Sequence, residues 1–366
     1  MTVGFYSPLP PDRTGVADYS AALLAGLRRH GPVEVAPARC TVPLYHLGNN
    51  SLHAAIYRRA LSDPGVVVLH DAVLHHFLLG QLSQAQYVEE FIYNYGDWNR
   101  GLAGELWRSR AASGTDSRYF DFPLLRRVLE RSLAVIVHNP AAALTASRHA
   151  PRARVAEIPH LFAPPDLPGE AAVLRFRQQL GIEPGTVVFG VFGFLRESKR
   201  LDTIFRAFET LHREFPRTAL LISGPFASTD LERASAPRLS QPGIFRLPYL
   251  PENEFWLAAG AADVCLNLRY PSTGETSGIA VRLMGIGKPV FMTDSLECQR
   301  FPEDACVRVA SGPAEFDSLL HHLVLLTSMK EVGRAVGLRG ARHISACHRV
   351  EEVSKQYWDL LCEFST

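Results

Sequence analysis

The segment from residue 264 to residue 293 constrains the fold of this chain more than any other. Val264–Leu268 and Pro289–Thr293 are short apolar runs typical of buried strands, and Ile279–Ile286 is an apolar stretch compatible with a helix. Between the first strand and the helix, Tyr270–Gly278 is rich in residues that interrupt regular structure. The order strand, loop, helix, strand predicts a parallel α/β sheet whose helix starts point backbone N–H groups toward anionic ligands.

The same alternation of strands and helices continues through both halves of the chain. Its 366 residues exceed one ordinary core, and a proline-rich run over 158–169 lies between the halves. We therefore expect an N-terminal domain over 1–160, a linker over 161–172, a C-terminal domain over 173–345, and a final helix over 346–366 that packs back on the first domain. The other expected strands are Val3–Tyr6, Val33–Pro37, Gly65–Leu69, Leu133–His138, Val187–Phe192, Ala219–Ser223 and Ile244–Leu247.

Composition excludes several functional classes. Hydrophobic residues make up 47 % of the chain and charged residues 20 %, the balance of a soluble globular protein. The net charge of +1 gives no electrostatic case for nucleic acid, and membrane contact is expected to be peripheral at most, through arginines such as Arg28 and Arg58. The six cysteines show no CxxC spacing, so we expect reduced, packed thiols and a cytoplasmic location.

Polar side chains follow two of the expected strands at their carboxyl ends. His70 and Asp71 come directly after Gly65–Leu69, and Asn139 follows Leu133–His138. Open α/β sheets place their chemistry at this edge, so these three residues are site candidates. For His70 the alternative is a buried histidine whose hydrogen bonds are satisfied within the core.

Two further features near the N-terminus leave alternatives open. Gly15 ends the loop after the first strand, where it either allows a ligand close to the backbone or merely shapes a turn. The three-glycine dinucleotide fingerprint is absent, so this is not a standard NAD site. His75 and His76 invite a metal interpretation, but the helix that follows supplies no further ligand at the right spacing, and we expect no metal site.

The region 84–127 is rich in aromatic and charged residues, spaced mostly as helix faces. Such residues are more often core or interdomain packing than a binding surface. The length of the region also allows it to shape an acceptor pocket.

These motifs together resemble glycosyltransferase family 4, a retaining family with the GT-B architecture of two doubly wound, Rossmann-like α/β domains and an interdomain cleft. The resemblance spans nearly the whole chain, although 84–127 matches nothing in the family. It depends on the order and spacing of several motifs, because no single one is decisive. They are the Gly15 loop, Leu69–Asp71, Gly193–Lys199, and Gly274–Gly278 opening a helix that ends in Gly287–Pro289.

The resemblance implies a retaining transfer of a sugar from a nucleotide-diphosphate sugar to an acceptor hydroxyl, without a cofactor or a metal. The acceptor would be a glycan, a lipid-linked molecule or a small molecule. Two alternatives stay open: a GT-B partner subunit that binds a nucleotide sugar without transferring it, and a nucleotide-sugar epimerase or hydrolase.

The resemblance also assigns roles to individual residues. Diphosphate would be held by Lys199, with help from Arg196 and from backbone N–H groups at the helix start. Glu275 would accept hydrogen bonds from the donor sugar, the alternative being that it satisfies N–H groups of its own loop. His70 would lie beside the transferred sugar, with Asp71 orienting the site. The helix-start donors are Ser277, Gly278 and Ile279, and the expected base contacts are Tyr249 and Leu250.

The sequence departs from the family pattern at two positions. The family's second glutamate is missing, since Leu283 stands at its usual spacing and Arg282 takes its place if the alignment is anchored on Gly287–Pro289. An arginine cannot accept a hydrogen bond from ribose, so Arg282 is expected to contact a phosphate or to form a salt bridge. Phe194 stands where the family commonly has a diphosphate-binding arginine.

Overall fold

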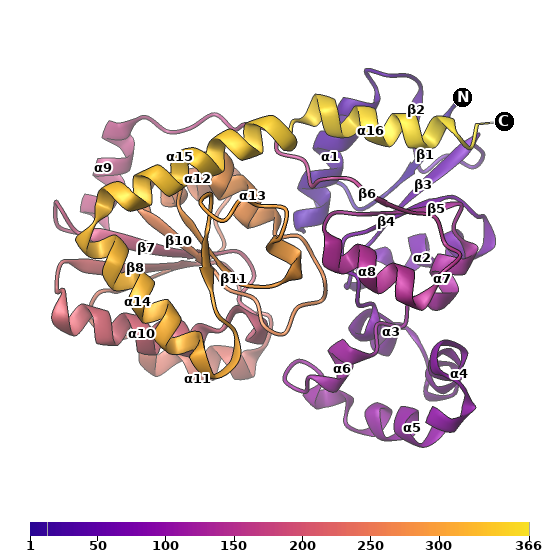
Figure 1. Ribbon diagram of the computed structural model, residues 1–366, viewed down its shortest axis with the longest axis horizontal. Helices are drawn as coiled ribbons and strands as arrows, with labels where there is room; N and C mark the ends of the chain where they lie inside the picture. The colour runs from indigo at the N-terminus through magenta and orange to yellow at the C-terminus, as the bar shows by residue number, and fades with distance from the viewer. Residues whose placement is uncertain (13, 366) are drawn as a thin grey trace. The chain divides into compact units, whose positions relative to one another are not determined.

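The computed structural model describes residues 1–12 and 14–365, which form two compact units (Figure 1). One unit comprises Met1–Ala163, Pro271–Gly278 and Cys347–Thr366, and the other comprises Pro164–Tyr270 and Ile279–Ala346. Each unit contains one parallel sheet of six strands with helices packed on it. The expected pair of doubly wound α/β folds is therefore confirmed.

The sheet of the first unit has the strand order β2-β1-β3-β4-β5-β6. Two of its strands were not predicted, β3 and β6. In β3, Pro43 lacks an N–H and His46 interrupts the apolar pattern, yet all six residues of the strand are buried between β1 and β4. The strands are β1 (Val3–Tyr6), β2 (Val33–Val35), β3 (Val42–Leu47), β4 (Val66–Leu69), β5 (Ala134–Val137) and β6 (Val155–Glu157).

One face of this sheet is covered by helices from both ends of the chain, α1 (Gly15–Leu27) and α16 (Val350–Cys362). Their buried side chains share one hydrophobic cluster with strand residues such as Val3 and Val68. The hydroxyls of Tyr19 and Tyr357 lie 2.8 Å apart within it. The last helix is thus part of the core of the first unit.

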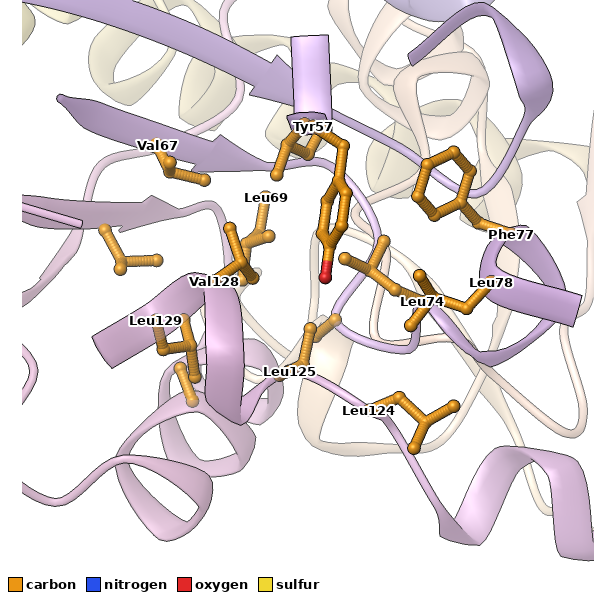
Figure 2. Close-up of a cluster of buried hydrophobic side chains, with 14 of the residues drawn as sticks. Tyr57, Val67, Leu69, Leu74, Phe77, Leu78, Leu124, Leu125, Val128 and Leu129 are labelled. Atoms are coloured by element: carbon orange, nitrogen blue, oxygen red, sulfur yellow. The ribbon is translucent and has the colours of Figure 1, made fainter. Parts of the chain in front are cut away.

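The other face carries α2 and α8 together with the helical segment between β4 and β5, which contains the aromatic region noted above. Side chains of this segment join strand residues in a second buried cluster. Figure 2 shows the Tyr57 ring of α2 lying among Leu74, Leu125 and Phe77. The aromatic residues of 84–127 are therefore largely core. The helices are α2 (Ala54–Ser62), α3 (His75–Gln81), α4 (Gln84–Tyr95), α5 (Arg100–Arg108), α6 (Arg118–Asp121), α7 (Arg126–Arg131) and α8 (Pro140–His149).

The sheet of the second unit has the order β12-β11-β10-β7-β8-β9. Its central strand β7 is an apolar run that is buried along its whole length, as expected for a parallel strand covered on both faces. The strands are β7 (Val187–Phe192), β8 (Thr218–Ser223), β9 (Ile244–Leu247), β10 (Val264–Asn267), β11 (Val290–Thr293) and β12 (Val307–Val309). The helices are α9 (Glu170–Gln179), α10 (Leu201–Glu214), α11 (Thr229–Leu239), α12 (Glu252–Ala261), α13 (Gly278–Gly285), α14 (Glu315–Ser328) and α15 (Lys330–Cys347).

All six cysteines are free thiols. The expectation that they are packed is wrong for Cys347 and Cys362, which are exposed at the C-terminal ends of α15 and α16. Across residues 1–12 and 14–365, every helix is too short or too polar to cross a membrane.

Candidate functional site

The predicted site residues fall into two groups, one in each unit. Those of the first unit come from strand ends and from the segment Pro271–Gly278, which is far away in sequence. The first group contains Gly15, His70, Asp71, Asn139, Glu275, Ser277 and Gly278, and the second contains Arg196, Lys199, Tyr249, Leu250, Ile279 and Arg282.

Asp71 and Glu275 are joined through the hydroxyl of Thr273. The Thr273 Oγ1 atom lies 2.8 Å from Asp71 Oδ1 and 2.5 Å from Glu275 Oε2. Glu275 Oε2 also accepts the Thr273 backbone N–H at 2.9 Å, and Asp71 Oδ2 accepts the Asn49 N–H at 2.8 Å. A threonine hydroxyl has one proton and donates it to one carboxylate at a time, so these contacts and the two backbone N–H bonds together fix the positions of both carboxyl groups. Thr273 was not singled out by sequence.

Backbone contacts hold the same segment against the end of β4. The Ala72 N–H donates to the Thr273 carbonyl at 2.8 Å. Gly274 has a φ of +73°, and a Cβ at this position would lie 2.8 Å from the Cβ of Ala72. A left-handed backbone and close approach both require glycine here, which gives a physical reason for the Gly274 of the sequence motif.

Asn139 fastens this segment to the end of β5. Its Nδ2 donates to the Gly274 carbonyl at 2.9 Å and to Thr276 Oγ1 at 3.0 Å. Its Oδ1 accepts the Ala142 N–H at 2.9 Å and so caps the start of α8. With all these contacts made inside the protein, Asn139 is a structural support for the Glu275 loop.

His70 lies in a cluster of aromatic rings at the carboxyl edge of the first sheet. Its Nε2 is 3.0 Å from Nδ1 of His46, a residue of the unpredicted strand β3. Tyr19 packs edge-on against His70 with a centroid distance of 5.0 Å, and His138 lies 5.3 Å away. His160 contacts both Tyr19 and His138, at centroid distances of 4.6 Å and 5.6 Å.

Burial favours the neutral form of four histidines in this cluster, His46, His53, His70 and His138. Loss of hydration lowers the pKa of His70 well below its usual range, and the neighbouring His46 and His138 act in the same direction. Burial likewise lowers the pKa of His138 and of His53 to about 4. His46 lies on β3 and His138 directly follows β5, 92 positions later, and only the sheet brings them together.

Among the described residues, no group of three or more His, Cys, Asp or Glu side chains is arranged to hold a metal ion. His75 is held within the helical segment, where Nδ1 donates to the Phe122 carbonyl at 2.8 Å and Nε2 lies 2.8 Å from the Tyr87 hydroxyl. Nε2 of His76 donates to the Ser113 carbonyl at 2.9 Å. Both side chains thus contribute to packing of this segment.

Gly15 is the first residue of α1 and directly follows the capping residue Thr14. Gly15 is exposed. A Cβ added to it would meet no atom within 4 Å. Its φ is not among the positive values of the chain, so the turn itself does not require glycine. Ser277 is buried, and α13 begins at Gly278 and continues with Ile279.

Lys199 is the buried cation of the second unit, 6 % exposed at the end of a short 3-10 turn. Its Nζ donates to the Phe192 carbonyl at 2.7 Å, at the carboxyl end of β7, and lies 3.5 Å from Asn267 Oδ1 at the end of β10. Arg196 is exposed, with its guanidinium 6.0 Å from the centroid of the Phe194 ring. Lys199 thus lies at the strand edge where parallel sheets bind ligands.

Of the two expected contacts of Arg282, a phosphate or a salt bridge, the structure contains a salt bridge, to Glu252. The NH2 of Arg282 contacts Glu252 Oε1, and its guanidinium stacks over Phe255 and Trp256 at 4.6 and 4.5 Å from the ring centroids. The Trp256 N–H donates to the same Glu252 oxygen at 2.7 Å. Arg282 therefore links α13 to α12. Tyr249 is about half exposed and Leu250 is partly buried, both in the loop after β9.

We expect the substitution Arg282→Glu to destabilise the second unit by about 1–2 kcal/mol, because it replaces a salt bridge and two cation–π contacts with carboxylate repulsion. Denaturant unfolding of the variant measures this change. Combining Arg282→Glu with Glu252→Arg is expected to recover part of the loss. An Arg282→Glu protein as stable as the parent would show that the pair contributes nothing.

Comparison with known proteins identifies the fold. The sequence matches no family model and no curated protein. Several solved structures, one of them a glycosyltransferase, are similar over almost the whole chain. HepE of Anabaena in complex with UDP is 15 % identical, with 99 % of this chain and 100 % of that chain covered and a TM-score of 0.61. Sucrose-phosphate synthase of Thermosynechococcus elongatus is 15 % identical, with 99 % of this chain and 98 % of that chain covered and a TM-score of 0.65. WaaG, a glycosyltransferase of lipopolysaccharide biosynthesis, is 12 % identical, with 98 % and 99 % covered and a TM-score of 0.61.

Proposed function

We propose that this protein is a cytoplasmic, metal-independent retaining glycosyltransferase that moves a sugar from a nucleotide-diphosphate sugar to an acceptor hydroxyl. The observation that supports it best is that Thr273 joins Asp71 and Glu275, two carboxylates that were both predicted for the site although they lie about 200 positions apart in sequence. The fold shared with WaaG, a glycosyltransferase, agrees with this assignment. HepE, whose structures contain UDP and UDP-glucose, makes UDP-sugars the first donors to test.

In this proposal each candidate residue has the role that the resemblance to the sugar-transferring family implies for it. In the second unit, the Lys199 ammonium binds the diphosphate, whose negative charge grows as the sugar departs. N–H groups at the start of α13 add to this stabilisation. In the first unit, the Glu275 carboxylate accepts hydrogen bonds from sugar hydroxyls, and His70 contacts the transferred sugar.

The proposal is tested by incubating the protein with UDP-, GDP-, ADP- and dTDP-sugars, each with and without candidate glycan, lipid-linked and small-molecule acceptors. Acceptor-dependent release of nucleotide is expected for at least one donor, with the anomeric configuration of the product unchanged by NMR. Equal nucleotide release with and without acceptor would identify a hydrolase instead. Binding without turnover in every combination would favour a non-catalytic binding subunit.

Lys199→Ala is expected to weaken binding of the nucleoside diphosphate by roughly 1.5–3 kcal/mol, the usual contribution of a charged hydrogen bond. Titration calorimetry with UDP or the preferred diphosphate measures the change. Lys330→Ala is the matched control, because this lysine is an exposed residue of the same unit. Unchanged affinity in a folded Lys199→Ala protein would remove Lys199 from the site.

Gly15→Ala is expected to leave the stability of the protein unchanged or slightly higher, so that any loss of activity reports on the approach of a ligand to the backbone. The new methyl group meets open space, and alanine favours helix more than glycine by up to about 1 kcal/mol, so stability should be unchanged or slightly higher. If a ligand approaches the backbone at this position, kcat/KM should nevertheless fall, by roughly tenfold or more. Steady-state kinetics beside a thermal unfolding curve tests this, and full activity would leave Gly15 with no role in binding.

A further inference from the structure

His46 and His70 form a buried pair on adjacent strands of the first sheet. His46 lies on β3 and pairs in register with Val68 of β4, two residues before His70. The rings are nearly parallel, with an interplanar angle of 21° and a distance of 3.0 Å from His46 Nδ1 to His70 Nε2. A neutral imidazole carries one N–H, so one ring donates and the other accepts. The direction of this hydrogen bond decides which nitrogen of His70 carries its proton.

Both rings are neutral, so each carries one proton. Burial lowers the pKa of His46 and of His70 well below the usual range of histidine. The groups that face the pair are uncharged aromatic and imidazole rings, and the described contacts include no carboxylate that would stabilise an imidazolium. They are Phe5 of β1, Tyr19 of α1, His53 after β3, His138 after β5 and His160 after β6.

The surroundings of the buried His46 Nε2 atom show which of the two histidines donates the hydrogen bond. This atom has no hydrogen-bond partner among the described residues, and His46 is fully buried. If His70 donated, the proton of His46 would be on Nε2 as a buried N–H without an acceptor, which folded proteins rarely contain. If His46 donates from Nδ1, its Nε2 is only an unused lone pair.

Two neighbouring histidines, His53 and His138, are also protonated at Nδ1 and have an unused lone pair at a buried Nε2. Nδ1 of His53 and Nδ1 of His138 lie 2.8 Å and 2.9 Å from the backbone carbonyls of His46 and Ile158. A carbonyl only accepts, so both rings are protonated at Nδ1. Their Nε2 atoms are buried without a partner, like that of His46. The cluster therefore tolerates unused lone pairs at these positions.

We infer that His46 is a positioning residue that donates from Nδ1 and holds His70 in the tautomer protonated at Nδ1. Of the two rings, only His70 retains some exposure, 9 % against 0 %. His70 thus offers a hydrogen-bond donor instead of a base. In the proposed glycosyl transfer, on which this inference rests, that donor suits an oxygen of the sugar nucleotide. His70 then does not remove the proton of the acceptor hydroxyl.

The tautomer is read directly by NMR of protein labelled with ¹⁵N-histidine, in which protonated and unprotonated ring nitrogens have separate shifts and distinct couplings. The His70 signals are assigned from their loss in His70→Gln. At pH 7.5 the His70 proton is expected on Nδ1 and the His46 proton on Nδ1. A His70 proton on Nε2 overturns the inference. This measurement needs no substrate, so its failure and the failure of the proposed function are distinguished.

Two variants of His46 separate positioning from packing. Asparagine places an amide N–H near the position of Nδ1, whereas leucine fills similar space without a donor. His46→Leu is expected to shift the His70 tautomer and lower kcat roughly tenfold, the scale of one lost hydrogen bond. His46→Asn is expected to keep the tautomer and most of kcat. An equal loss of kcat in both variants, with an unchanged His70 tautomer, would contradict a positioning role for His46. If His46→Leu does not fold, the NMR spectra of the parent protein and of His46→Asn decide whether His46 sets the His70 tautomer.

Discussion

Lowering the pH from 7 to 5 is expected to destabilise the first unit by several kcal/mol, before most carboxylates are protonated. The pKa of His53 and of His138 is about 4 in the folded protein, against about 6.5 in the unfolded chain. The unfolded chain therefore binds more protons between these values, and stability falls as the pH drops through this window. Each of the two groups costs about 2 kcal/mol by pH 5 and about 3 kcal/mol when fully titrated.

His46 and His70 add to this loss, because their pKa values are lowered in the same direction. The loss from His53 and His138 alone, about 4 kcal/mol by pH 5, is close to the lower end of the stability of an ordinary domain, which is about 5–15 kcal/mol. Denaturant unfolding curves recorded from pH 7.5 to 5 measure the effect. The loss is expected in the transition of the first unit, to which all four histidines belong.

A double variant, His53→Asn with His138→Asn, provides the decisive comparison. Each asparagine keeps an N–H donor near the position of Nδ1 but does not titrate, so the dependence of stability on pH should become shallower by about 4 kcal/mol between pH 7 and 5. His321→Asn is the matched control, because that histidine is exposed in the second unit. A double variant with the same pH dependence as the parent would show that the cluster is not the source.

Thr273→Val is expected to lower kcat/KM roughly 100-fold and stability by about 2–3 kcal/mol, because valine has the shape of threonine without the hydroxyl that joins Asp71 to Glu275. Without this hydroxyl, Glu275 Oε2 keeps the Thr273 N–H and the Ser272 hydroxyl but loses its link to Asp71, so the carboxylate shifts from the position in which it would receive the sugar. A displacement of about 1 Å at a reacting centre is enough for a loss of this size. Steady-state kinetics and denaturant unfolding measure the two effects.

Thr273→Ser keeps the hydroxyl and is expected to retain most of the activity. Thr210→Val is the control for the substitution itself, since the Thr210 hydroxyl only bonds the carbonyl one helical turn before it. If Thr273→Val is as active as Thr273→Ser, the bridge has no function in catalysis. If stability falls while activity is kept, Thr273 supports the loop alone.

The sequence predicted the folds of both units because long β-branched and apolar runs, such as those of β4 and β7, have few alternatives to a buried parallel strand. It also located His70, Asp71 and Asn139, since strand ends can be recognised from local pattern. It missed β3, where Pro43 and His46 break that pattern and burial between two neighbours compensates.

What only the tertiary structure decided was which polar groups meet. Sequence spacing carries no signal that His46 lies beside His70, or that Thr273 touches Asp71, because these contacts depend on strand order and on the return of the chain at residues 271–278. Likewise, the missing glutamate could be noticed from sequence, but the salt bridge of Arg282 to Glu252 needed the packing of α13 against α12. Local pattern determined most of the elements, whereas long-range packing determined β3 and the hydrogen bonds of the site.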